Sequence, residues 1–253
     1  MFRFQNQAGL ACLCSILLMT ACQGNNNRVE LAYVERPVEV LYNSAARELD
    51  KRDYDQAIAL FNEVERQHPY SEWARRAVLM SAFAAYQGRM YNDSIDAARR
   101  YISLNPGSED AAYAYYLVAV SFFEQITDVG RDQRTTELAK AALDELIRRF
   151  PSSEYAKDSR LKLDMVNDQL AGKEMTVGRW YLRQNKHLAA INRFRTVVSE
   201  YDTTTHAPEA LYRLVEAYLS VGLEGEALAA AAVLGHNHPE SEWYSDAYRI
   251  MTR

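Results

Sequence analysis

Apolar residues recur along most of the chain with the spacing of a single helix face. In two of the clearest segments they stand at i, i+3, i+4 and i+7: Ala57, Leu60, Phe61 and Val64, and again Ala139, Ala142, Leu143 and Leu146. Side chains at this spacing share one face of an α-helix, because the helix turns once in about 3.6 residues. The pattern therefore predicts a succession of amphipathic helices.

Five segments repeat one arrangement of small, apolar and helix-ending residues. Their ends are alike: Gln67-His68-Pro69, Leu104-Asn105-Pro106, Arg149-Phe150-Pro151, Glu200-Tyr201-Asp202 and Asn237-His238-Pro239. A small residue stands twelve positions before each end: Ala57, Ser94, Ala139, Ala190 and Ala227. Four positions later stand Phe61, Ala98, Leu143, Phe194 and Ala231, and two positions after each end stand Ser71, Ser108, Ser153, Thr204 and Ser241. This repetition predicts one structural unit used five times.

Each recurring position has a structural role in a hairpin of two helices. The small residue lets two helices cross closely, and the residue one turn later packs against the partner helix. Proline biases the residue before it away from the helical conformation and so ends the unit. Ser and Thr are good N-caps, so we expect each recurring hydroxyl to begin the next helix.

The unit resembles the tetratricopeptide repeat, in which a Tyr precedes the small residue. Asp53-Tyr54-Asp55-Gln56-Ala57 and Met90-Tyr91-Asn92-Asp93-Ser94 carry that Tyr. The resemblance implies an all-α fold, a right-handed α-solenoid of five tetratricopeptide-like helix hairpins within residues 37–253. The expected repeats are residues 37–70, 71–107, 108–152, 153–203 and 204–250. Generic packing of helix hairpins is the alternative interpretation.

The repeats are longer than the usual unit. Their ends are 37, 45, 51 and 37 residues apart, against about 34 for the typical tetratricopeptide repeat. We assign the excess in the third unit to an inserted segment, residues 127–134, and the excess in the fourth to a longer helix pair through Lys157 to Tyr181. Because insertions in such arrays fall on loops, often at a binding face, Asp128, Arg131 and Asp132 are candidate contact residues.

The first 21 residues predict a targeting segment. Ala8 to Met19 is apolar apart from Ser15 and follows the single basic residue Arg3, which suits a signal peptide and is too short to span a bilayer. The sequence then continues Leu17-Leu18-Met19-Thr20-Ala21-Cys22, which resembles a bacterial lipoprotein signal. The resemblance implies cleavage after residue 21, lipidation of Cys22 and a flexible tether over residues 22–36. Ordinary secretion, or an uncleaved anchor, is the alternative.

Composition and charge narrow the functional class. Lys and Arg number 29 against 34 Asp and Glu, a net charge of −5, so the chain lacks the basic excess of a nucleic-acid binder. All three cysteines, Cys12, Cys14 and Cys22, lie in the targeting segment or at its end. The helical body therefore has no disulfide and no thiolate metal site, and packing alone must stabilise it.

The chain shows no catalytic signature. It contains no phosphate-binding glycine motif, no His-Glu-x-x-His and no Gly-x-Ser-x-Gly. His236 and His238 have a spacing that two metal ligands could share, but we interpret them as part of the exposed loop that closes the last repeat. We therefore predict that the protein is not an enzyme and that it carries no cofactor other than the lipid on Cys22.

Aromatic residues are the most informative part of the body. Residues 111–123 are apolar on nearly every side, so this helix is expected to be covered by neighbours. Several of the 17 tyrosines stand near helix starts and could line a peptide groove, since tyrosine buries a large area and keeps a hydroxyl. The alternative is that these rings only fill the interfaces between hairpins.

Longer runs resemble one family in particular, the BamD family of lipoproteins that assemble outer-membrane β-barrels. They are Glu65-Arg66-Gln67-His68-Pro69-Tyr70, Ile102-Ser103-Leu104-Asn105-Pro106, Tyr113-Ala114-Tyr115-Tyr116-Leu117, Asp128-Val129-Gly130-Arg131-Asp132 and Ala190-Ile191-Asn192-Arg193-Phe194. The likeness covers about residues 22–250. It implies a lipid anchor on the periplasmic side of the outer membrane and a non-catalytic role in inserting barrel proteins. Because Gln23 replaces the Asp that favours inner-membrane retention in well-studied lipoproteins, the outer membrane is the expected location.

The same resemblance implies two binding surfaces. The first three repeats hold a pocket for the C-terminal segments of unfolded outer-membrane proteins, with His68, Tyr70, Tyr113 and Tyr116 as candidates. The last repeats dock a POTRA domain of the barrel protein BamA through Asn192 and Arg193, and the lipoprotein BamC where it exists. His68 stands where the family often has Tyr, and Leu117-Val118-Ala119 where it often has Leu-Arg-Gly.

Two other functions fit the repeats less well. Another periplasmic tetratricopeptide lipoprotein, for example one that coordinates cell-wall synthesis, would keep repeat spacings closer to 34 residues. A hydrolase with accessory repeats would need a second domain, for which the mature chain leaves no room.

Overall fold

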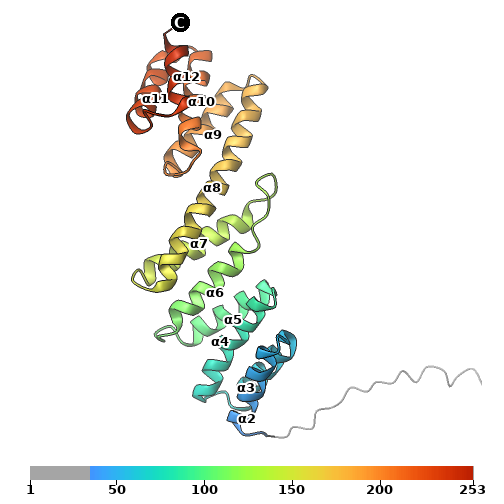
Figure 1. Cartoon of the computed structure of the whole chain (residues 1–253). Coiled ribbons are helices and arrows are strands. Elements are labelled where there is room, and N and C mark those ends of the chain that lie inside the picture. Colours follow the sequence, from blue (N-terminus) through green and yellow to red (C-terminus); the bar gives the residue numbers. More distant parts are fainter. Residues whose placement is uncertain (1–34, 253) are drawn as a thin grey trace, which may run out of the picture. The chain divides into compact units, whose positions relative to one another are not determined.

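The computed structural model describes residues 35–252, and all regular secondary structure in that range is helical. The helices follow one another along the chain (Figure 1): α2 Val38–Asp50, α3 Tyr54–Gln67, α4 Glu72–Gln87, α5 Tyr91–Leu104, α6 Ala111–Phe123, α7 Arg134–Arg149, α8 Glu154–Arg183, α9 His187–Glu200, α10 Ala207–Ser220, α11 Glu224–Asn237 and α12 Glu242–Met251. The prediction of an all-α chain of helix hairpins is confirmed. The predicted signal peptide and Cys22 lie outside the described residues.

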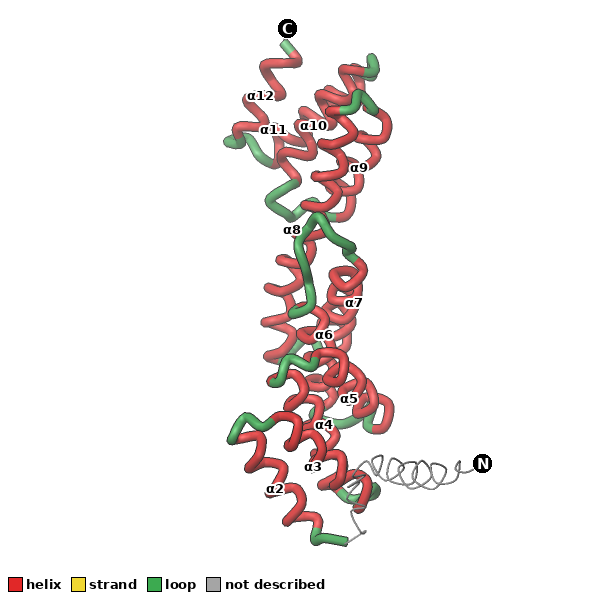
Figure 2. Tube along the Cα trace, turned by 90° about the vertical axis from the view of Figure 1, so that its right-hand side faces the viewer, coloured by secondary structure: helices red, strands yellow, loops and turns green. Residues whose placement is uncertain are grey.

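Each helix from α2 to α11 packs against the next one along the chain, as Figure 2 shows. The first helices of neighbouring hairpins also touch directly, in the pairs α2 with α4, α4 with α6, and α6 with α8. These first helices therefore form a surface of their own, which we call the first-helix face.

The recurring small residues lie where the helices are closest. Ala57, Ser94, Ala139, Ala190 and Ala227 are all fully buried. Phe61, Ala98, Leu143 and Phe194, one turn further on, are fully buried as well. Ala231 is only partly buried, because its hairpin is the last and only the short helix α12 follows it.

The five hairpins end in one backbone conformation. The C-cap residues His68, Asn105, Phe150, Tyr201 and His238 have φ between −137° and −130° and ψ between 37° and 56°. Tyr201 adopts this conformation although Asp202 follows it, so the proline is not required for the helix to end.

The predicted N-caps are confirmed at three of five positions. Ser71, Ser153 and Ser241 each accept a hydrogen bond from a backbone N–H of the first turn of the next helix, at 3.0–3.2 Å. At Ser108 and Thr204 the prediction was wrong, since α6 and α10 begin two residues later than the pattern implies. The Ser108 hydroxyl bonds the Tyr101 hydroxyl at 2.8 Å, and Thr204 donates to the carbonyl of Tyr201 at 2.7 Å.

Helix α6 is covered by neighbours as its composition predicts. It packs against α4, α5, α7 and α8, and residues from Ala111 to Phe122 are buried on several of its sides. No helix among residues 35–252 is both long enough and apolar enough to cross a membrane.

Helix α8 is one continuous helix of 30 residues, about 45 Å long. Val166 and Leu170 pack in the apolar core shared with α4 to α7, whereas Ala171 and Met175 pack in the core shared with α9 to α12. The excess length of the fourth unit therefore lies in this single helix, which joins the two cores.

Gly178 allows α9 to approach α8 closely. A Cβ atom at this position would lie 2.5 Å from Cε1 of the fully buried Phe194. We expect Gly178→Ala to lower the unfolding free energy by about 1–3 kcal/mol through overpacking, despite the better helix propensity of alanine. Gly225→Ala is the control, because nothing lies within 4 Å of its Cβ position in α11. Urea unfolding of both variants checks this; equal stability of the two would contradict the close packing.

Candidate functional site

An aromatic cluster lies on the first-helix face and consists of Phe83 of α4, Tyr113 and Tyr116 of α6, and Tyr155 of α8. The Tyr155 ring lies 5.3 Å from the Tyr113 ring and 5.2 Å from the Tyr116 ring. Phe83 and Tyr116 each lie 6.5 Å from Tyr113, and the two tyrosines of α6 are stacked. The four side chains are only half-buried, so the rings fill the spaces between helices and still offer faces to a ligand.

A polar network fixes the edge of this cluster. The Tyr116 hydroxyl donates to Oδ2 of Asp158 at 2.7 Å, and the Lys162 ammonium lies 2.8 Å from the same oxygen. Lys162 also lies over the Phe123 ring, 5.5 Å from its centroid. Because Asp158 and Lys162 both come from α8, the network ties α6 to the next hairpin.

Raised pKa values keep the hydroxyls of Tyr113 and Tyr116 neutral. Burial raises the pKa of Tyr113 to about 12, with smaller contributions from Tyr155 and Tyr86. Burial and the hydrogen bond to Asp158 raise the pKa of Tyr116. Burial alone would raise the pKa of Asp158, but the hydrogen bonds from Lys162 and Tyr116 outweigh it and lower the pKa. At neutral pH the cluster therefore presents neutral phenols beside a carboxylate–ammonium pair.

The other two residues predicted for the peptide groove lie elsewhere. His68 caps α3, and its Nε2 lies 2.8 Å from the carbonyl oxygen of Arg36. Tyr70 is fully exposed in the turn between α3 and α4. Within residues 35–252, no hydrogen bond or ring contact joins either of them to Tyr113 or Tyr116. The structure thus brings two of the four predicted residues together.

Arg193 lies on the exposed side of α9, next to the predicted partner residue Asn192. Its guanidinium pairs with the Glu174 carboxylate of α8 at 3.1 Å, and its side chain remains 45% exposed. Arg193 is therefore held in place by one neighbour and is still accessible to a partner.

The inserted loop between α6 and α7 is ordered by contacts within itself and with α8. Asp128 accepts from the N–H of Gly130 at 2.7 Å, and Asp132 accepts from the N–H of Arg134 at 3.1 Å. The buried Gln133 side chain donates to the carbonyl oxygens of Asp128, Val129 and Arg131. The two aspartates thus shape the loop, and the exposed Arg131 side chain is the one left to contact a partner.

The loop and the Arg193 pair meet at one cleft of about 510 Å³. Its lining includes Arg131, Arg134, Glu137, Lys173 and Glu174. The Lys173 ammonium lies 3.4 Å from the carbonyl oxygens of Gly130 and Arg131, and Glu174 is the partner of Arg193. The loop residues and Arg193, which were predicted separately, are therefore connected through Glu174, and we call this region the loop–α9 surface.

His236 and His238 both lie at the end of the last hairpin. His236 is exposed in the last turn of α11, and His238 caps that helix. Across the described part of the chain, no group of three or more His, Cys, Asp or Glu side chains is placed to hold a metal ion.

The α8 residues that complete the aromatic cluster and the loop–α9 surface were not identified from the sequence. Tyr155, Asp158 and Lys162 recur at i, i+3 and i+7 on α8 and so share one helix face, which is a signal the sequence contains. Lys173 and Glu174 gave no such signal, because their roles depend on where the inserted loop folds back onto α8.

Comparisons with known proteins agree along most of the chain. The family model described as YfiO, outer membrane lipoprotein, matches residues 34–234. The outer membrane protein assembly factor BamD of Caulobacter vibrioides is 54% identical over 233 residues, which cover 92% of this chain and 76% of that protein. BamD of Rickettsia prowazekii is 43% identical over 235 residues, covering 93% and 92% of the two chains. Among solved structures, the TPR domain of P58(IPK) matches with a TM-score of 0.44 at 14% identity, covering 85% of this chain and 56% of that one.

The lowered pKa of Asp158 gives a pH-dependent prediction. A carboxyl whose folded-state pKa lies below its unfolded value of about 3.9 stabilises the fold at neutral pH, and this stabilisation is lost as pH falls through the folded-state pKa. Asp158→Asn should therefore lower the unfolding free energy by up to about 1 kcal/mol at pH 7, and the difference should shrink as the pH falls through the folded-state pKa of Asp158. Urea unfolding at pH 7 and at a series of acidic pH values measures this. Asp144→Asn, which removes an exposed partner of Lys140, is the control; an equal loss there would contradict a specific role for Asp158.

Proposed function

Because the chain belongs to the YfiO family of outer membrane lipoproteins, we propose that it is the BamD component of the complex that assembles β-barrel proteins in the outer membrane. Its role is non-catalytic: it receives unfolded outer membrane proteins and holds the barrel protein BamA for their insertion. The observation that carries this proposal is the likeness to two BamD proteins along nearly the whole chain. Lipidation of Cys22 anchors the helical body to the periplasmic face of the membrane.

The aromatic cluster is the proposed site for the C-terminal segments of substrates. Half-exposed tyrosine rings bind side chains of an extended peptide with little loss of conformational entropy, and the hydroxyls of Tyr113 and Tyr155 can donate hydrogen bonds to it, since only that of Tyr116 is held by Asp158. The pair of Asp158 and Lys162 fixes the Tyr116 ring before the peptide arrives, so binding does not need to order it. Because the disordered substrate must itself be ordered, the affinity is expected to be modest.

The loop–α9 surface is the proposed docking site for a POTRA domain of BamA. Arg193 supplies an accessible guanidinium, which suits a carboxylate of the partner. The inserted loop lines the cleft that also contains Glu174, the partner of Arg193, and adds the side chain of Arg131. Lipoproteins such as BamC are further candidate partners of these repeats.

Helix α8 connects the two proposed sites. Tyr155 and Asp158 lie in its first turns, and Lys173 and Glu174 lie about four turns further on. A single rigid helix therefore carries a residue set of each site and keeps the substrate site at a fixed distance from the docking surface.

The substrate site is tested by replacing two rings of the cluster. We expect Tyr116→Ala with Tyr155→Ala to weaken binding of a fluorescent peptide, made from the last ten residues of an outer membrane protein, by tenfold or more. A tenfold change in affinity corresponds to about 1.4 kcal/mol of binding free energy, and the loss of two stacked aromatic contacts removes at least that much. Fluorescence anisotropy measures the affinity. Tyr248→Ala, on the exposed side of α12, is the control and should leave it unchanged; equal affinities of all three proteins would exclude the cluster.

The docking surface is tested by reversing one charge. Arg193→Glu should reduce the amount of BamA recovered with the lipidated protein in detergent at least tenfold, because two like charges then face each other at the contact. Arg195→Glu makes the same charge change at a neighbouring exposed position of α9 and should keep recovery near the wild-type level. Similar recovery with both variants would remove Arg193 from the interface.

A further inference from the structure

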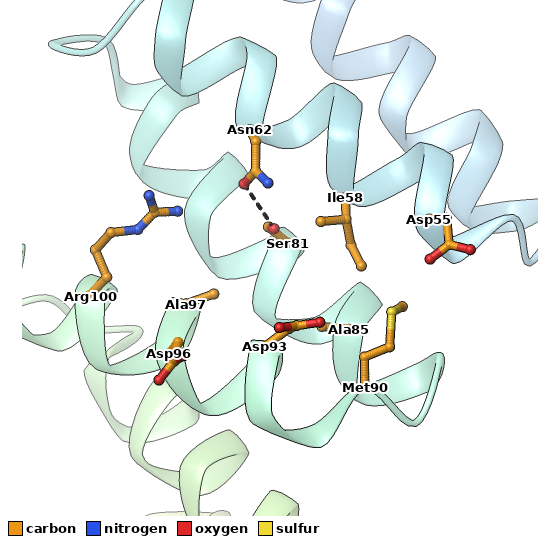
Figure 3. A pocket seen from close by; sticks show the side chains of 10 residues that line it. All are labelled: Asp55, Ile58, Asn62, Ser81, Ala85, Met90, Asp93, Asp96, Ala97 and Arg100. Carbon is orange, nitrogen blue, oxygen red and sulfur yellow. Dashed lines mark hydrogen bonds between the residues drawn. The ribbon is translucent and has the colours of Figure 1, made fainter.

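A second groove lies between the second helices of the first two hairpins. Helices α3 and α5 form its walls and α4 forms its floor, and its volume is about 440 Å³ (Figure 3). We call it the α3–α5 groove. It is lined by Asp55, Ile58, Asn62, Ser81, Ala85, Met90, Asp93, Asp96, Ala97 and Arg100. None of these residues belongs to the aromatic cluster or to the loop–α9 surface.

Small and apolar side chains make the groove hollow. Ser81 and Ala85 on the floor are only 3% and 1% exposed, and larger residues there would fill it. Ile58 and Met90 point into the space between the helices from opposite walls, as Figure 3 shows, and both are partly buried. The inner part of the groove therefore suits aliphatic side chains.

One polar group on the α3 wall, the amide of Asn62, is positioned for a peptide backbone. The Ser81 hydroxyl donates to Oδ1 of Asn62 at 3.1 Å, which fixes the orientation of the amide. The Nδ2 group of Asn62 has no acceptor within residues 35–252, so its two N–H donors are available to a carbonyl oxygen in the groove.

The rim of the groove is negatively charged. Asp55, Asp93 and Asp96 are exposed, and none has a cationic partner within 4.0 Å among residues 35–252. Arg100, the only cation that lines the groove among residues 35–252, pairs with Glu65 of α3 at 3.0 Å. Asp55 and Asp93 favour the positive ends of their helices, but that interaction does not neutralise the potential they direct to solvent.

The groove is long enough for a short extended segment. Beyond the pair of Arg100 and Glu65, a second cleft of about 360 Å³ continues between the ends of α3 and α5. It is lined in part by Tyr70 and Leu104, whose side chains are 102% and 63% exposed, and its cation Arg75 pairs with Glu72 at 3.7 Å. Both helices have 14 residues, or about 20 Å, which matches about six residues of extended chain.

We propose that the α3–α5 groove binds an extended segment of a partner protein that carries Lys or Arg beside aliphatic residues. The aliphatic side chains contact Ile58, Ala85 and Met90, and the cations reach the three aspartates over their flexible stems. The Asn62 amide donates to a backbone carbonyl of the segment. An acidic segment is excluded, because its carboxylates would face the unpaired aspartates.

The test uses the full mature chain in detergent and a fluorescein-labelled peptide, Gly-Leu-Lys-Leu-Arg-Leu-Gly, in an anisotropy titration. Asp55→Asn, Asp93→Asn and Asp96→Asn are combined in one variant, which we expect to bind at least tenfold more weakly. Glu224→Gln, Glu226→Gln and Glu240→Gln form the matched control, since they remove three exposed carboxylates elsewhere and two of them also lie in a first helical turn. The control should bind within twofold of wild type.

A second variant separates shape from charge. Ala97→Phe fills the groove from the α5 wall and keeps all three aspartates, so it should also weaken binding at least tenfold, with the fold checked by circular dichroism. A peptide with Glu in place of Lys and Arg should not bind. The proposal is overturned if the wild-type chain does not bind the basic peptide or if the control variant loses affinity equally. It is also overturned if the aromatic-cluster variant, Tyr116→Ala with Tyr155→Ala, loses binding while the aspartate variant and Ala97→Phe do not.

Discussion

The continuity of helix α8 is the constraint on which the other features depend. Leu170 and Ala171 are neighbours in the chain but belong to two different apolar cores, so a break or kink there would separate the hairpins before α8 from those after it. Gly178 allows Phe194 to lie against the helix where a Cβ would clash, and Gly172 leaves room for His206, whose Nε2 would lie only 3.2 Å from a Cβ. Both proposed binding surfaces use α8 residues, and their spacing is therefore set by helix geometry rather than by loops.

The two surfaces differ in how their residues are held. In the aromatic cluster, rings from three helices pack together and one carboxylate fixes the edge, so the surface is largely formed before a ligand binds. At the loop–α9 surface, Arg193 already has a partner in Glu174. A carboxylate that binds Arg193 must replace or share this contact, so the exchange favours specificity over affinity. The α3–α5 groove is different again, since Asp55, Asp93 and Asp96 have no cationic partner among residues 35–252 that a ligand would have to displace.

The sequence predicts burial well and backbone turns poorly. The five small residues and most of their apolar companions are buried as expected, because side-chain size and period report directly on helix packing. The turns inside four hairpins contain a residue with positive φ, and three of these are Arg52, Arg89 and Asn185 rather than glycine. Nothing in the side chain of an arginine indicates that conformation. The aromatic cluster was only partly predicted from the sequence. Tyr113 and Tyr116 stand out in an apolar helix, whereas the role of Asp158 depends on the register between α6 and α8, which the sequence does not show.

The extra length of α8 preserves the direction in which its faces point. Helix α8 has 30 residues and α4, which begins at the same position of the repeat after a serine cap, has 16. The difference of 14 residues corresponds to nearly four complete turns, about 40° short of a full multiple. Helix α9 and the hairpin that follows it are therefore displaced along α8 by about 21 Å, but they are rotated around α8 by only about 40°. Length variation in this helix is consequently limited to steps that keep the phase, since each additional residue would rotate α9 by about 100° around α8 relative to the hairpins before it.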